Sequence, residues 1–174
     1  MTTHPARILL VDDEPNLRKV LGALLQQEGF EVHAEADGAA ALARVRASPS
    51  GTFDGVITDL RMPELDGIGL LRALVREDPE LPVVLLTAHG TVEDAVAAMR
   101  AGASDYLTKP VNLQELNFII ERCLASKGLR NELDYYRKRD LAGNDASGDA
   151  GGGIGLIGES SIIRTLRELV LRLA

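Results

Sequence analysis

Short apolar runs alternate, over about two thirds of the chain, with longer segments in which apolar residues recur at helical spacing. The run at 7–11 has the length of a strand, and Leu17, Leu21 and Leu24 follow it on one helix face. The same alternation predicts further strands and helices: strands near 30–35, 54–58, 82–87 and 105–108, and helices near 38–47, 67–77, 91–101 and from 112 onward. Strands separated by helical crossovers pair in parallel, so the pattern predicts an α/β fold with a five-stranded, doubly wound parallel sheet.

The last predicted helix has no clear stop before about Leu141. At 1.5 Å per residue it would be about 45 Å long, which exceeds what packing on a small domain requires. We therefore predict an extended C-terminal helix whose second half projects. Leu129, Leu133 and Tyr136 continue an apolar edge along it, and this edge predicts a two-fold homodimer. Gly128 inside the helix suggests a break, because glycine costs roughly 1 kcal/mol relative to alanine there.

The pattern divides the chain into four parts. Residues 1–125 form one domain, and 126–141 continue its last helix as a linker. Residues 142–155 are rich in glycine and predict a flexible linker. Residues 156–174 carry an amphipathic helix whose apolar face needs a partner, so we interpret them as the start of a further, truncated domain.

Composition narrows the class of protein. Of the 174 residues, 45% are hydrophobic and 26% are charged, a balance that indicates a globular protein with a buried core. No apolar run is long enough to cross a membrane, so we expect no membrane contact. The single cysteine, Cys123, lies on the apolar face of the last helix and is predicted to be a buried structural thiol. Because it cannot form an internal disulfide, we predict a cytoplasmic location.

The charge distribution argues against nucleic-acid binding by this chain. Its net charge is −7, and residues 1–126 carry 19 acidic against 11 basic side chains. A protein that binds the phosphate backbone needs a cluster of lysine and arginine on one face. We therefore predict no direct contact with DNA or RNA.

Polar residues occur where the predicted strands end. Asp12 and Asp13 follow the first strand, Asp59 ends the third, Thr87 ends the fourth and Lys109 follows the fifth. In an open parallel sheet, ligands bind at the carboxyl ends of the strands. Converging carboxylates make a hard oxygen site suited to Mg²⁺, and a lysine and a hydroxyl beside it can hold a phosphoryl group on the third-strand aspartate.

Four segments in this order resemble the receiver domain of bacterial two-component response regulators: ILLVDDE at 8–14, DLRMPELDG at 59–67, LLTAHG at 85–90 and DYLTKP at 105–110. The resemblance covers about residues 6–125. It implies a flavodoxin-like sheet with strand order 2-1-3-4-5 and phosphorylation by a sensor histidine kinase.

The resemblance also assigns roles to residues. Asp59 is implied as the phosphoacceptor, with Asp13 and Asp59 as direct Mg²⁺ ligands and Asp12 acting through water. The backbone carbonyl of Arg61 is implied as a further metal ligand, and Lys109 as the contact of the phosphoryl group. It further implies a switch pair, two residues that tune phosphate lifetime and a cis peptide bond: Thr87 and Tyr106, Arg61 and His89, and Lys109–Pro110.

The C-terminal tail carries a second resemblance. LIGESS at 156–161, followed by an amphipathic helix, looks like the entry to the ATPase domain of sigma-54-dependent transcriptional activators, although Ser161 replaces the usual proline. No GxxxxGK[ST] phosphate loop occurs, so this chain by itself is not an NTPase and is not expected to be an enzyme. Contacts with DNA and with sigma-54 RNA polymerase are expected only through domains beyond residue 174.

Other functions remain open on these residues. A metal-dependent phosphatase could use Asp59 as its nucleophile, but it would need a general acid at the position of Arg61. A stand-alone receiver that signals by protein contact is a second alternative. A nucleotide-binding domain is disfavoured because no glycine fingerprint follows the first strand.

Overall fold

The structure is a computed structural model that describes residues 4–88 and 90–143. The elements follow one another as β1 (Arg7–Val11), α1 (Pro15–Gln27), β2 (Glu31–Glu35), α2 (Gly38–Ala47), β3 (Gly55–Asp59), α3 (Gly67–Glu77), β4 (Val83–Thr87), α4 (Val92–Arg100), β5 (Asp105–Thr108) and α5 (Leu113–Gly143). The five predicted strands and five predicted helices are therefore present, and their ends lie within two residues of the predicted ranges.

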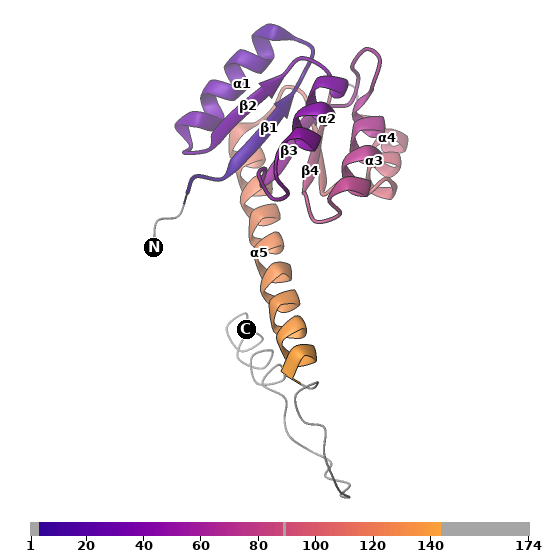
Figure 1. Ribbon diagram of the computed structural model, residues 1–174. Coiled ribbons are helices and arrows are strands. Elements are labelled where there is room, and N and C mark those ends of the chain that lie inside the picture. Colours follow the sequence, from indigo (N-terminus) through magenta and orange to yellow (C-terminus); the bar gives the residue numbers. More distant parts are fainter. Residues whose placement is uncertain (1–3, 89, 144–174) are drawn as a thin grey trace, which may run out of the picture. The chain divides into compact units, whose positions relative to one another are not determined.

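The strands form one parallel sheet in the order β2-β1-β3-β4-β5, which confirms the predicted fold and strand order (Figure 1). In register, Val11 of β1 stands opposite Thr58 of β3, and Thr87 of β4 stands opposite Thr108 of β5. The carboxyl ends of β1, β3, β4 and β5 are thereby brought to one edge of the sheet. Helical crossovers produce this alignment because they return the chain to the same end before each new strand.

Helices cover both faces of the sheet, and alternate strand residues supply the two cores. On one face, Leu9, Val56 and Leu85 pack against α2, α3 and α4. On the other face, Leu10 and Leu86 pack against α1 and α5. The central strands β3 and β4 are buried along their whole length. Burial on both faces explains why VVLL at 83–86 in β4 is a continuous rather than an alternating apolar run.

Polar caps and glycines fix the ends of the helices. Asp37, Asp66 and Thr91 precede α2, α3 and α4, and each accepts a hydrogen bond from the main-chain N–H three residues further on. Gly29 and Gly102 follow α1 and α4 with φ angles of 93° and 102°, a conformation that glycine adopts without strain. The caps start α2, α3 and α4 at the carboxyl edge of the sheet, and the two glycines end α1 and α4 at its amino edge.

Helix α5 is continuous over its 31 residues, so the break suggested at Gly128 is wrong. A single exposed glycine weakens a helix but does not force a kink, because the hydrogen-bond ladder needs no side chain. Lys127 Nζ donates to the main-chain oxygen of Phe53 at 3.1 Å, which ties the helix to the loop before β3. Beyond this contact, Leu129 and Leu133 are each about half exposed. None of the described helices has the length and apolar content to cross a membrane.

Gly67, the first residue of α3, lies where a side chain has no room. A Cβ at this position would come within 2.3 Å of the main-chain oxygen of Asp59 and within 2.9 Å of the Cα of Leu60. Both neighbours are backbone atoms at the end of β3, so they cannot move away as a flexible side chain could. We expect Gly67→Ala to lower the free energy of unfolding by about 1–3 kcal/mol, measured by chemical denaturation.

Gly128→Ala is the matched control for this prediction. Nothing in the described structure lies within 4 Å of a Cβ at Gly128, and alanine favours a helix by roughly 1 kcal/mol. The control should leave the denaturation midpoint unchanged or higher. Equal midpoints for Gly67→Ala and the unmodified chain would show that the close approach at α3 is not real.

Candidate functional site

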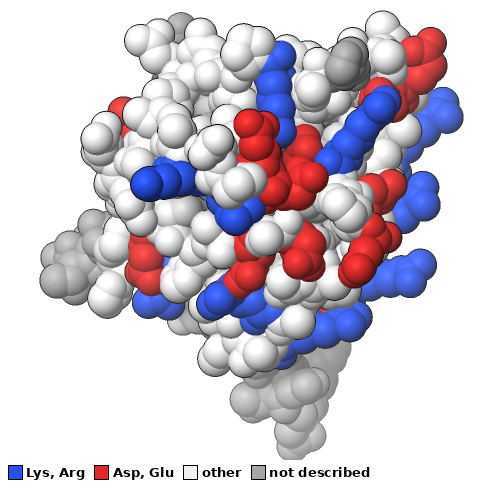
Figure 2. Space-filling model, turned by 90° about the horizontal axis from the view of Figure 1, so that it is seen from above, with Lys and Arg blue, Asp and Glu red and all other residues white. Residues whose placement is uncertain are grey.

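The polar strand ends meet at the carboxyl edge of the sheet. Asp12 and Asp13 lie directly after β1, Asp59 and Thr87 are the last residues of β3 and β4, and Lys109 follows β5. Seen onto this edge, acidic side chains gather near the middle, with basic side chains to either side (Figure 2). The structure therefore brings together the residues that the sequence analysis selected from four different strands.

Three carboxylates form a compact cluster. Asp12, Asp13 and Asp59 each offer an oxygen, and these oxygens lie within 4.8 Å of one another. Asp12 and Asp59 are buried, whereas Asp13 is exposed, so the cluster is open to solvent on one side. Carboxylate oxygens are hard ligands, and two or three of them with room for water match the needs of a small divalent cation. The donor set thus fits a magnesium ion.

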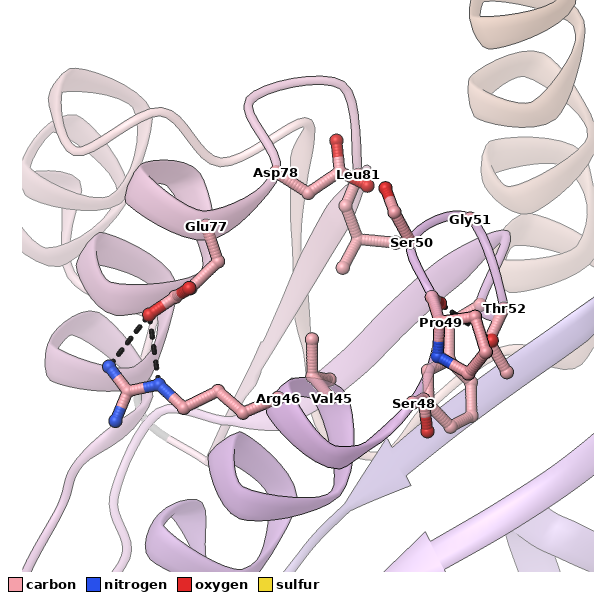
Figure 3. A pocket seen from close by; sticks show the side chains of 11 residues that line it. Val45, Arg46, Ser48, Pro49, Ser50, Gly51, Thr52, Glu77, Asp78 and Leu81 are labelled. Carbon is pink, nitrogen blue, oxygen red and sulfur yellow. Dashed lines mark hydrogen bonds and ion pairs between the residues drawn. The ribbon is translucent and has the colours of Figure 1, made fainter.

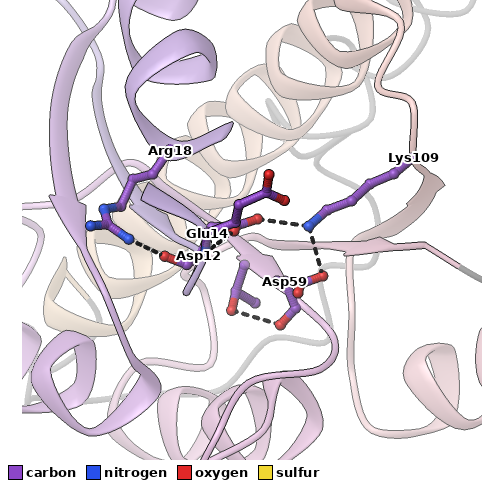
Figure 4. A network of polar contacts seen from close by, with 6 residues as sticks. Asp12, Glu14, Arg18, Asp59 and Lys109 are labelled. Atoms are coloured by element: carbon purple, nitrogen blue, oxygen red, sulfur yellow. Dashed lines mark hydrogen bonds and ion pairs between the residues drawn. The ribbon is translucent and has the colours of Figure 1, made fainter. Parts of the chain in front are cut away.

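Lys109 bridges two of the three acids. Its Nζ lies 2.8 Å from Oδ2 of Asp12 and 3.1 Å from Oδ1 of Asp59, and both contacts are visible in Figure 4. Burial opposes the charged lysine, but the hydrogen bond and negative charge of Asp12, together with the charge of Asp59, outweigh it and raise the pKa of Lys109. Lys109 therefore stays protonated as the counter-charge of the cluster. Its peptide bond to Pro110 is cis.

Asp59 is the acid whose ionisation the surroundings disfavour. Its side chain is 11% exposed. Burial, and to a smaller extent the negative charge of Asp12, raise the pKa of Asp59 above its ordinary value of 3.8, while Lys109 counteracts the shift. A further positive charge placed at the cluster would relieve this cost, so the site favours a bound cation.

Each polar group of Asp12 has a hydrogen-bond or ion-pair partner. Its Oδ1 accepts the main-chain N–H of Glu14 at 2.9 Å, and its own N–H donates to the main-chain oxygen of Glu35 at 3.3 Å. The Arg18 guanidinium donates to its main-chain oxygen. Arg18 was not among the site residues predicted from the sequence. A signal for it existed, because an arginine in the first turn of a helix opposes the helix dipole.

Thr87 and Tyr106 lie on the neighbouring strands β4 and β5. Thr87 is 1% exposed. The Tyr106 hydroxyl is buried and has no hydrogen-bond partner within the described parts of the chain. A Cβ at Gly90 would lie 3.6 Å from this hydroxyl and 2.4 Å from Cγ2 of Thr108, so the β4–α4 loop packs closely against β5. An unpaired buried hydroxyl is costly, so the packing of the Tyr106 side chain against the core is what holds it in this position.

Two residues, Arg61 and His89, were predicted to tune the lifetime of the phosphate. Arg61 is exposed in the loop after β3, two residues beyond Asp59. His89 lies outside the described residues. Both roles stay predictions.

A hollow of about 160 Å³ lies at the opposite, amino edge of the sheet, between the ends of α2 and α3 and the loop before β3 (Figure 3). An ion pair between Arg46 and Glu77 lies at its rim, with a shortest distance of 2.7 Å. Its remaining polar lining is serine, threonine and one aspartate, which forms no cluster comparable to that at the carboxyl edge.

Cys123 is partly buried against the core, and burial raises the pKa of its thiol, as expected for a structural cysteine.

Residues 8–121 match the response regulator receiver domain, and the chain belongs to this family. Among curated relatives, the regulatory protein AtoC of Escherichia coli (strain K12) is 42% identical over 132 residues, which is 76% of this chain and 28% of AtoC. The chain thus spans only about a quarter to a third of the length of the curated relatives it matches first.

Solved structures agree with this assignment. A receiver domain protein from Clostridium thermocellum is 35% identical with a TM-score of 0.68, covering 71% of this chain and 98% of that one. NtrX from Brucella abortus is 33% identical with a TM-score of 0.71, covering 97% of this chain but 34% of NtrX. NtrX has also been solved in complex with ADP and with ATP.

Proposed function

We propose that this chain accepts a phosphoryl group on Asp59 from a partner histidine kinase in the presence of Mg²⁺. The observation that supports this most is the arrangement of three carboxylates from two strands with one lysine that contacts two of them. This arrangement offers an acceptor oxygen, a place for a divalent cation and a fixed positive charge within one small site. The chain is then a phosphoacceptor rather than an enzyme that turns over an independent substrate.

Each residue has a chemical part in this proposal. Asp59 supplies the carboxylate oxygen that attacks phosphorus, and the bond from phosphorus to the kinase histidine breaks in line with it. Lys109 lies beside the attacking group and neutralises charge on the phosphoryl oxygens. Asp12, Asp13 and Asp59, with the Arg61 carbonyl, would hold Mg²⁺, which supplies further charge neutralisation when bound.

Thr87 and Tyr106 are proposed to report the phosphorylation. Thr87 ends the strand next to Asp59 and can donate its hydroxyl hydrogen to a phosphoryl oxygen. Movement of Thr87 would open space beside Tyr106, whose hydroxyl has no partner within the described structure to hold it in place. The change would then reach the surface of α4 and β5, where Val92, Val96 and Met99 are exposed.

The test is phosphorylation of the full chain by a small acyl-phosphate donor with Mg²⁺. We expect one acid-stable, base-labile phosphate per chain, detected by intact mass spectrometry, and no labelling when the cation is removed by a chelator. Continuous hydrolysis of a generic phosphomonoester would instead support the phosphatase alternative. Labelling that is equal with and without the cation would contradict the proposal.

We further propose that the receiver controls a sigma-54-dependent transcription-activating domain. The similarity to NtrX extends over 97% of this chain, whereas this chain spans only 34% of NtrX, a protein solved with bound ATP. A nucleotide-binding domain after the receiver is therefore consistent with the relatives. The first two residues of the predicted linker at 142–155 belong to α5, while its remainder and the predicted domain start at 156–174 lie outside the described residues. The boundary at 125, like the cytoplasmic location, stays a prediction.

The proposed output also requires self-association through α5. Leu129 and Leu133 are 49% and 48% exposed, and a second copy of the helix would cover this apolar surface. The side chain of Tyr136, the third residue of the predicted edge, lies outside the described part of the structure. We expect light scattering to give a dimer for the full chain and a monomer for a truncation that ends at Ser126. Two monomers, or two dimers of equal strength, would exclude α5 as the dimerisation element.

A further inference from the structure

Arg18 occupies a position that helix electrostatics disfavour. It lies in the first turn of α1, where the helix dipole places partial positive charge. Basic residues near the ends of α2, α3 and α4 have the opposite, favourable placement in the last turn of the helix: Arg44 and Arg46 in α2, Arg76 in α3 and Arg100 in α4. A residue that breaks a local rule at the edge of a functional site calls for a role that compensates for it.

The contact of Arg18 indicates that role. Its Nη1 donates to the main-chain oxygen of Asp12 at 2.5 Å, on the side of Asp12 away from Lys109 (Figure 4). This oxygen belongs to the peptide unit that joins Asp12 to Asp13, and a peptide unit is planar. Holding this oxygen in place therefore fixes the orientation of the peptide plane that precedes Asp13.

The next peptide unit is held as well. The N–H of Glu14 belongs to the peptide that joins Asp13 to Glu14, and it donates to Oδ1 of Asp12 at 2.9 Å. Both peptide units that flank Asp13 are thus restrained, one by Arg18 and the other by the Asp12 carboxylate. Asp13 is itself exposed, so the direction of its side chain depends mainly on this restrained backbone.

We propose that Arg18 is a positioning residue for the cation site, which holds the backbone so that the Asp13 carboxylate meets Asp59. The inference rests on the proposed Mg²⁺-dependent function. Charge alone predicts the opposite effect of removing Arg18, because a cation next to an acidic cluster repels Mg²⁺. The direction of the change in Mg²⁺ affinity therefore separates a positioning role from a simple charge effect.

The experiment is a Mg²⁺ titration of the full chain, followed by amide chemical shifts and by calorimetry. Arg18→Met should weaken Mg²⁺ binding about tenfold or more, because residues that orient metal ligands contribute at this level. The amide signals of Asp13 and Glu14 should also move in the metal-free state. Arg18→Lys, which keeps a donor and the charge, should recover most of the affinity.

Lys19→Met is the matched control, since it removes one positive charge from the adjacent, exposed position. It should leave the affinity unchanged or slightly higher. An affinity of Arg18→Met equal to or above that of the unmodified chain would overturn the positioning role, as would unfolding of this variant at the titration temperature. An unmodified chain that binds no Mg²⁺ would instead overturn the proposed function.

Discussion

Asp59→Asn is expected to abolish phosphorylation by an acyl-phosphate donor, to below the detection limit of intact mass spectrometry. The amide that replaces the carboxylate is a poor nucleophile, although it keeps the size of the side chain and can still accept a hydrogen bond from Lys109. Among the three clustered acids, Asp59 ends a strand at the centre of the sheet and contacts the lysine directly. Asp12 and Asp13 follow a different strand, β1, so neither occupies the position of Asp59 at the end of β3.

Asp54→Asn provides the matched control. Asp54 precedes the same strand at its other end and accepts the main-chain N–H of Arg7 at 2.9 Å, a bond that asparagine can also accept. Phosphorylation of this variant should equal that of the unmodified chain. Undiminished labelling of Asp59→Asn, or equal losses in both variants, would contradict the assignment of Asp59.

Asp59→Asn should also stabilise the cation-free protein at neutral pH. Burial raises the pKa of Asp59 in the folded state, so the folded chain binds a proton more tightly than the unfolded chain does. Stability therefore falls as the pH rises from the unfolded value of about 3.8 through the raised value, and the loss persists above it. Asp59→Asn removes this loss, and its unfolding midpoint should exceed that of the unmodified chain at pH 7 but not at pH 3.

The fold could be predicted because its signals are local. The run at 83–86 is uniformly apolar because β4 is buried on both faces, and alternation of such runs with helical segments predicts a parallel sheet. The convergence of Asp12, Asp59 and Lys109 follows from the same topology, because parallel strands end at one edge. The site was thus predictable from strand ends alone, before any side-chain contact was known.

Contacts that depend on a side chain's path were not predictable. The contact from Arg18 to the Asp12 carbonyl requires the guanidinium to turn back over the first turn of α1, and sequence spacing does not encode that rotamer. The contact from Lys127 to Phe53 joins residues 74 positions apart and depends on the angle at which α5 crosses the sheet. At Gly128 the predicted break was wrong, because the low helix propensity of a single glycine did not interrupt a long helix.

Asp13→Ala is expected to remove both Mg²⁺ binding and cation-dependent phosphorylation. Asp13 contributes the one exposed carboxylate of the cluster, and its loss leaves Asp12 and Asp59, which Lys109 already contacts. The remaining pair carries too little uncompensated charge to hold a strongly hydrated cation. Calorimetry should show no binding heat, and the acyl-phosphate donor should label the variant at no Mg²⁺ concentration.

Glu14→Ala tests whether this loss is specific to the cluster. Glu14 is the adjacent exposed acid, it is not a member of the cluster, and its main-chain N–H can still bond to Asp12 after the substitution. An exposed charge at this distance acts mainly through screened electrostatics, so Mg²⁺ affinity should stay within about threefold of the unmodified value. Asp13→Ala with unchanged Mg²⁺ affinity, or equal losses in both variants, would mean that general negative charge rather than Asp13 holds the cation. Only a direct ligand distinguishes Asp13 from its exposed neighbour Glu14.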